Sequence, residues 1–122
     1  MSDNTKNTEK AQQNSSTSEE IQVVSFDLIV HSGQARTLVH KAMKSMRAGD
    51  FDEAQKYLDE AEEELLDAHK SQTKLLQEYA GGKKIEMEII LVHAQDHLMT
   101  TMTLREVAVE MMFIYQELAK KN

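Results

Sequence analysis

The sequence predicts an all-α protein, and three observations support this prediction. Leu, Ala, Glu, Lys, Gln and Met, which all favour helices, dominate the composition, while Pro is absent and Gly occurs four times. Apolar residues recur at helical spacing over long stretches, and no clear strand-type alternation is present. The 122 residues are enough for one domain with a modest core. We expect an antiparallel three-helix bundle.

The N-terminal segment differs from the rest of the chain. Residues 1–16 consist mainly of Asn, Ser, Thr, Gln and Lys, with almost no apolar side chain. Such a segment cannot offset its ordering entropy by burial, so we expect a disordered tail. The helical domain is then expected to cover residues 17–122.

The first helix is bounded by clear local signals. Thr17-Ser18-Glu19-Glu20 has the Thr-x-x-Glu form of a capping box, and Gly49 suits a left-handed helix stop. We therefore expect a helix at about 18–48. Asp50-Phe51-Asp52-Glu53 offers a second capping box immediately afterwards, which predicts a tight antiparallel hairpin.

The second helix is expected at about 51–79, where Gly81-Gly82 ends it. Its apolar positions are Ala54, Tyr57, Leu58, Ala61, Leu65, Ala68, Leu75 and Leu76. The acidic run from Asp59 to Glu64 is interpreted as a solvated outer face.

The third helix, expected at about 85–121, carries two apolar stripes. One consists of Ile89, Val92, Asp96, Thr100, Thr103, Val107, Met111, Ile114 and Leu118. The other consists of Leu91, Leu98, Met102, Val109 and Phe113. A helix that packs only against its bundle neighbours needs one apolar face. The second stripe therefore predicts a symmetric assembly around this helix. If Asp96 lies at its centre, several copies converge and need a cation or a proton between them.

Charge and composition exclude several classes of function. The net charge of −7 argues against binding to nucleic acids and to anionic membranes. Without cysteine, neither disulfides nor thiolate chemistry is available. The sequence shows no secretory signal and no run of apolar residues long enough for a membrane span. We expect a soluble cytoplasmic protein.

The strongest candidate for a functional site is the stretch from Val92 to Thr100. On a helix, its residues His93, Asp96 and His97 share one face. Ionisable groups in an apolar segment are costly unless they are paired, which makes them candidates for function. Three interpretations fit: a metal site, hydrogen-bonded structural histidines, and a nucleophilic histidine that carries a phosphoryl group.

Sequence spacing alone does not choose among these interpretations, although it weakens the first. His93-x-x-x-His97 resembles a zinc motif, but Ala94 stands where a His-Glu-x-x-His protease has its general base. The Glu-x-x-His pairs of di-iron bundles are also missing. His31, His40 and His69 are interpreted as structural or surface residues.

The string Leu91-Val92-His93-Ala94-Gln95-Asp96-His97-Leu98-Met99-Thr100, followed by Leu104-Arg105-Glu106, resembles the signature of lactose/cellobiose-type enzyme IIA. This family belongs to the bacterial phosphoenolpyruvate-dependent sugar phosphotransferase system. Further similar stretches are His31-Ser32-Gly33-Gln34-Ala35-Arg36, Gly49-Asp50-Phe51, and Ala68-His69 with Gln72-Thr73-Lys74-Leu75. The resemblance covers roughly residues 18 to 120.

The resemblance implies a homotrimer with a central coiled coil of third helices. It implies that His93 accepts a phosphoryl group from phospho-HPr at Nε2, as a tele-phosphohistidine, and passes it to a cysteine of enzyme IIB. The membrane component IIC is then an indirect partner. Asp96 would hold one divalent ion, Mg²⁺ by its oxygen ligands, shared by three subunits. Gln95 and His97 are candidates for supporting the phosphoryl oxygens or the seam between subunits, and His97 fits a packing role one turn below His93 equally well. The family points to a β-linked disaccharide such as cellobiose, chitobiose or lactose.

Two other functional hypotheses stay open beside the phosphocarrier. One is a non-catalytic helical protein that binds a partner through its surplus apolar stripe. The other, weaker hypothesis is a metal-dependent hydrolase. Loss of function in His93→Ala would favour the carrier, loss in Val107→Asp or Met111→Asp alone the interaction protein, and loss with chelators the hydrolase.

Overall fold

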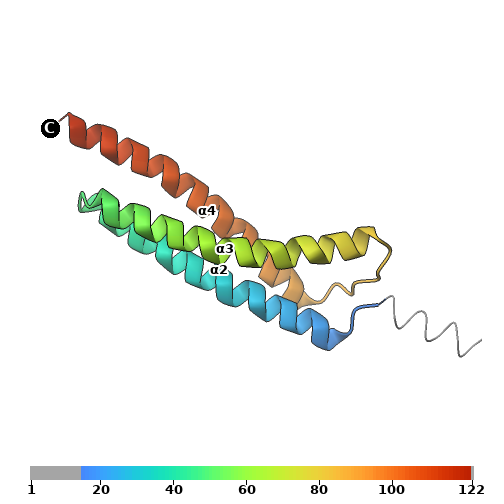
Figure 1. The fold of residues 1–122 in the computed structure, drawn as a ribbon. Helices are drawn as coiled ribbons and strands as arrows, with labels where there is room; N and C mark the ends of the chain where they lie inside the picture. The colour runs from blue at the N-terminus through green and yellow to red at the C-terminus, as the bar shows by residue number, and fades with distance from the viewer. Residues whose placement is uncertain (1–14, 122) are drawn as a thin grey trace, which may run out of the picture.

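The computed structural model describes residues 15–121, which form three long helices and the segments that join them. They are α2 (Ser18–Arg47), α3 (Phe51–Ala80) and α4 (Ile89–Lys120). Figure 1 shows α2 and α3 as an antiparallel hairpin, which α4 crosses at an angle while running in the same direction as α2. The predicted all-α three-helix architecture is confirmed over this range. Within it, no helix combines the length and the apolar character that crossing a bilayer requires.

Local capping contacts define the hairpin, as the sequence predicts. The backbone N–H of Glu20 donates to Thr17 Oγ1 at 3.1 Å, and that of Glu53 donates to Asp50 Oδ1 at 3.2 Å. Each bond satisfies a donor that the first turn of a helix leaves free. Gly49 lies in the turn with φ of +79°, a left-handed conformation that glycine adopts without strain.

The expected start of the third helix is wrong, because α4 begins at Ile89 rather than at residue 85. Two tertiary contacts hold the preceding linker in a non-helical conformation. The Ser16 N–H donates to the Lys84 carbonyl at 2.9 Å, and Ile85 packs on a small cluster of Ile21, Leu75 and Leu91. The linker therefore closes one end of the bundle.

The contact with Lys84 also corrects the expectation for the end of the N-terminal tail. Ser15 forms a parallel bridge with Lys84, and Ser16 is buried. These two residues are ordered by the linker. The rest of the expected tail, residues 1–14, lies outside the described residues.

The main core runs along all three helices and combines small with large apolar side chains. Its fully buried members include Leu28, Val39, Leu58, Ala61, Ala94 and Leu98. On α3, Gln72 occupies the core-facing line and is buried. Leu76, which the sequence predicts to be in the core, is instead 54% exposed. Leu76 follows the core residue Leu75 directly, so its side chain is turned about 100° away from the core-facing line.

The two stripes predicted for α4 differ in how far their side chains are buried. Leu91 and Leu98 of the second stripe face α2 and α3 and are fully buried. Phe113 was expected to belong with them but is 56% exposed. The first stripe faces away from the hairpin, and its exposed members are Ile89, Val92, Asp96, Thr100, Thr103, Val107, Ile114 and Leu118. We call these residues the open stripe of α4.

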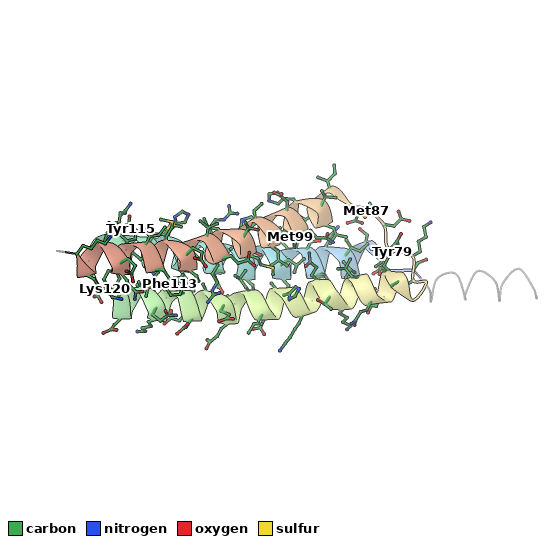
Figure 2. All side chains as sticks on the ribbon, turned by 90° about the horizontal axis from the view of Figure 1, so that it is seen from above. Tyr79, Met87, Met99, Phe113, Tyr115 and Lys120 are labelled. Atoms are coloured by element: carbon green, nitrogen blue, oxygen red, sulfur yellow. The ribbon has the colours of Figure 1, made fainter. Side chains whose placement is uncertain are left out.

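Other large apolar side chains are also exposed, among them Met87, Met99 and Phe113 (Figure 2). The open stripe differs from scattered exposed residues in its helical spacing along a single helix, in steps of three and four with one step of seven between Val107 and Ile114. A single chain therefore leaves this line uncovered, with exposed apolar side chains on both sides of the polar residues Asp96, Thr100 and Thr103. Such lines on soluble proteins mark interaction surfaces.

Candidate functional site

His93 and His97 lie one turn apart near the N-terminal end of α4, and the structure brings their rings together. The ring centroids are 6.1 Å apart, with the planes inclined by 73°, so that the contact is edge-to-face. His93 is exposed, whereas His97 is partly buried against the hairpin. A reactive group on another protein can therefore reach His93 while His97 is held beside it.

The other two predicted site residues point elsewhere within one chain. Asp96 is exposed and belongs to the open stripe of α4. Gln95 is half-buried, and its separation of two residues from His93 turns it about 200° around the helix. A single chain therefore pairs His93 with His97, whereas Gln95 lies on the opposite side of α4.

His97 is in an environment that disfavours its charged form. Burial lowers the pKa of His97 most, the guanidinium of Arg36 and the neighbouring His93 lower it further, and Asp96 has a smaller opposite effect. Its Nδ1 atom is buried and has no hydrogen-bond partner among residues 15–121. His97 is therefore disposed to be a neutral imidazole with one N–H.

Arg36 from α2 is part of this site, and the sequence did not indicate a role for it. Its terminal Nη2 donates to Thr100 Oγ1 at 2.9 Å, across the contact between α2 and α4. Thr100 Oγ1 lies 2.7 Å from the Asp96 carbonyl and 3.3 Å from that of His97. Arg36 thus joins the histidine turn to α2. Two signals could have pointed to it: its place in the family-like stretch from His31 to Arg36, and its charge between the buried Ala35 and the core position Val39.

His31 belongs to a separate polar link between α2 and α3. Its Nδ1 lies 2.6 Å from Glu64 Oε2, and its Nε2 lies 3.3 Å from Asp27 Oδ1. The hydrogen bond to Glu64 raises the pKa of His31 most, the charges of Asp27, Glu64 and Asp67 add to this, and burial opposes it. His31 therefore has a structural partner on each ring nitrogen, whereas the other two histidines outside the site, His40 and His69, are exposed.

A metal ion would need more ligands than one chain supplies. Residues 15–121 contain no group of three or more histidine or carboxylate side chains that could hold an ion. The Asp96 carboxylate is exposed, and no hydrogen bond or ion pair engages it within that range. Its oxygen atoms fit a hard divalent cation, but only if further copies of the chain converge on it.

Comparisons with known proteins agree with this geometry. Residues 23–116 match the family model of the lactose/cellobiose-specific IIA subunit of the phosphotransferase system. The chain is 41% identical over 104 residues to a lichenan-specific phosphotransferase enzyme IIA component of Bacillus subtilis, covering 85% of this chain and 94% of that protein.

Solved structures of similar proteins have the same fold. The crystal structure of PtcA from S. mutans superposes with a TM-score of 0.82 at 56% identity, covering 83% of this chain and 99% of that one. A solution structure of the complex of IIA(Chitobiose) with HPr from Escherichia coli superposes with a TM-score of 0.71 at 41% identity, covering 82% and 97%. The matched region contains all three helices almost completely, together with the paired histidines. The chain therefore belongs to the lactose/cellobiose-specific IIA family of the sugar phosphotransferase system.

Proposed function

We propose that this protein is a cytoplasmic phosphocarrier that accepts a phosphoryl group on His93 from phospho-HPr and passes it to a cysteine of enzyme IIB. The observation that carries the proposal is the exposed His93 ring beside a partly buried His97. Family membership supports it, since one similar structure is a complex with HPr. IIB and the membrane component IIC would then deliver the group to a β-linked disaccharide during uptake.

The protein contributes to phosphoryl transfer mainly by positioning the reacting groups and by stabilising the charge of the transition state. A lone pair on His93 Nε2 attacks the phosphorus, and the bond between phosphorus and the donor breaks as the new N–P bond forms. Such transfers pass through a loose transition state, so in-line placement and hydrogen bonds to the three phosphoryl oxygens dominate the rate. The exposed His93 meets the first need. A neutral His97 can meet the second by donating one N–H.

The second transfer reverses the direction of the first. The thiolate of the IIB cysteine attacks the phosphorus on His93, and the N–P bond breaks, so that His93 regains its lone pair. Because both partners must approach the same nitrogen, His93 has to stay accessible in the assembled protein. Its exposure at the edge of the open stripe agrees with this need.

Phosphorylation in vitro tests the proposal. The protein is incubated with phosphoenolpyruvate, enzyme I and HPr, and its intact mass is measured. We expect one phosphate per chain, labile to acid and stable to base, on the wild type and on the control His40→Ala. His93→Ala should carry none. A label on any other side chain would remove the assignment.

We further propose that three chains assemble through the open stripe of α4, with Asp96 near the threefold axis. The exposed apolar residues of the open stripe would be buried against their copies in a symmetric assembly. Three convergent carboxylates repel each other unless a divalent ion, Mg²⁺ by its preference for oxygen ligands, lies between them. A bound ion would neutralise that charge.

Sedimentation tests the assembly separately from the chemistry. The wild type should sediment as a trimer at micromolar concentration, and Val107→Asp, with a charge on the open stripe, should sediment as a monomer. Asp96→Leu should remain trimeric but no longer retain a divalent ion. A monomeric wild type would refute the assembly. The helical interaction protein, the alternative that the open stripe favours, predicts that Val107→Asp abolishes function while His93→Ala does not.

A further inference from the structure

Three buried polar side-chain atoms have no hydrogen-bond partner within residues 15–121, and two of them are complementary. They are Ser32 Oγ, Arg36 Nε and His97 Nδ1. The Nε atom of an arginine is always a donor, and the unprotonated nitrogen of a neutral imidazole is an acceptor. Buried groups of this kind are rarely left unpaired in folded proteins.

The three atoms belong to one place, the contact between α2 and α4. Ser32 and Arg36 are one turn apart on α2, so they share a face. Arg36 reaches Thr100, whose hydroxyl lies 3.3 Å from the His97 carbonyl. The guanidinium of Arg36 is thus anchored within one turn of the His97 ring.

We propose that Arg36 is a positioning residue whose Nε–H donates to His97 Nδ1 once a small side-chain movement joins these two unpartnered atoms, and thereby keeps the His97 proton on Nε2. Which nitrogen of an imidazole carries the proton is set by the hydrogen bond that the other nitrogen makes. With Nδ1 accepting from Arg36, the Nε2–H is free to donate. This inference rests on the proposed function, because the Nε2–H of His97 would donate a hydrogen bond to the phosphoryl group on the neighbouring His93.

Arginine suits this position better than lysine does. Its guanidinium presents Nε–H and Nη–H in a rigid fork, so one bond to Thr100 leaves a second donor in a fixed direction. The ammonium of a lysine is a point charge on a flexible stem and cannot define both directions at once. The side chain therefore orients His97 in addition to contributing its charge.

The competing state is the other tautomer of His97. With the proton on Nδ1, the ring would donate to a carbonyl, and its Nε2 would be an acceptor that repels phosphoryl oxygens. A hydroxyl donor from Ser32 could also satisfy Nδ1 without Arg36. The two alternatives give different spectra in the variants below.

The test is a long-range ¹H–¹⁵N correlation spectrum of the full-length, ¹⁵N-labelled protein at a pH where imidazoles are neutral. His97→Gln identifies the His97 signals by their loss. We expect the wild type to show His97 protonated on Nε2, and Arg36→Gln and Arg36→Lys to show mixed tautomers. The matched control Arg105→Gln removes another arginine that joins two helices, through Leu58 and Glu62, and should leave the tautomer unchanged.

Several outcomes would overturn the inference. A wild-type His97 protonated on Nδ1 refutes it without any variant, so the test does not depend on whether Arg36→Gln folds. An unchanged tautomer in folded Arg36→Gln refutes it, and so does a shift in Ser32→Ala alone, because the donor would then be the serine.

Phosphorylation rates separate this inference from the proposed function. Arg36→Gln should still be labelled on His93, but roughly 10- to 100-fold more slowly, as is typical when a group that orients a functional side chain is removed. If the wild type is not labelled on His93, the phosphocarrier proposal fails while the tautomer result stands. If labelling is normal in Arg36→Gln, the positioning role fails while the phosphocarrier stands.

Discussion

The link between His31 and Glu64 makes the stability of the helical hairpin depend on pH. We consider the substitution His31→Gln, which keeps a neutral donor at the same place but removes the group that can gain a positive charge. In the wild type, the two ring nitrogens can both donate only when the imidazole is protonated. The carboxylates that face it are Asp27 on α2 and Glu64 and Asp67 on α3.

The magnitude follows from the two contacts. A charge-assisted hydrogen bond stabilises a protein by roughly 1.5–3 kcal/mol. The 2.6 Å bond to Glu64 belongs at the lower end of that range because the His31 and Glu64 side chains are 28% and 31% exposed and partly screened. The contact with Asp27, four residues away, adds about 0.3–0.5 kcal/mol. Gln keeps a neutral bond worth about 1 kcal/mol, so His31→Gln should lower the free energy of unfolding by about 1 kcal/mol where the imidazole is charged.

The direction of the pH dependence follows from the raised pKa of His31. A group whose pKa is higher in the folded than in the unfolded protein stabilises the fold fully below its unfolded pKa, ordinarily about 6.5. This contribution is lost as the pH rises through the folded pKa. The difference between wild type and His31→Gln should thus be largest near pH 5.5 to 6, where the carboxylates are still ionised, and small near pH 9.

Urea unfolding at fixed protein concentration measures this difference, since oligomers gain stability with concentration. A loss of about 1 kcal/mol corresponds to a midpoint lower by roughly 0.5 M urea at typical slopes. His40→Gln, at an exposed histidine on the same helix, is the control and should match the wild type at both pH values. A difference for His31→Gln that is equal at both pH values, or larger at pH 9, would refute the reasoning.

Three further predictions concern stability and use the same urea measurement near neutral pH. Leu98→Ala should cost about 2–5 kcal/mol because Leu98 is fully buried in the main core, whereas Leu98→Met should cost less than about 1.5 kcal/mol; equal costs would contradict a tightly packed site. Asp50→Ala should cost about 1 kcal/mol through loss of the bond from the Glu53 N–H, and Asp50→Asn should restore it. Gly49→Ala should cost about 1–2 kcal/mol for conformational reasons alone, since no atom lies within 4 Å of the added Cβ and φ is +79°; a neutral result would mean that the turn rearranges.

The parts of the fold that could be predicted from the sequence are those with local causes. Thr17 and Asp50 cap their helices through a backbone N–H three residues away, and Gly49 turns the chain where its own conformation allows it. The start of α4 has no such cause, because its N-cap residue Glu88 makes no side-chain capping bond. It depends on a hydrogen bond between Ser16 and Lys84, which are far apart in the chain.

The same division applies to the candidate site. Helical spacing places His93 and His97 on one face, and their ring contact agrees with this. The partner of that face could not be predicted in the same way. Arg36 and Thr100 are 64 residues apart, and only the packing of α2 against α4 brings them together. The family resemblance includes the stretches that contain Arg36 and Thr100, but nothing in the sequence pairs the two residues.

The two stripes of α4 bear on the proposal that His93 accepts the phosphoryl group. Residues of α4 that face the hairpin are buried, whereas residues of the open stripe are exposed in a single chain. His93 lies between these two groups, one to two turns before the point where Arg36 of α2 binds Thr100. A group on that border stays reachable when both stripes are covered, while the helix beneath it is held rigid from both sides. The contact with the His97 ring then limits the orientation of the His93 ring, as in-line phosphoryl transfer requires. A histidine in the middle of either stripe would lose access to its partners, and one on an exposed loop would lose its fixed position.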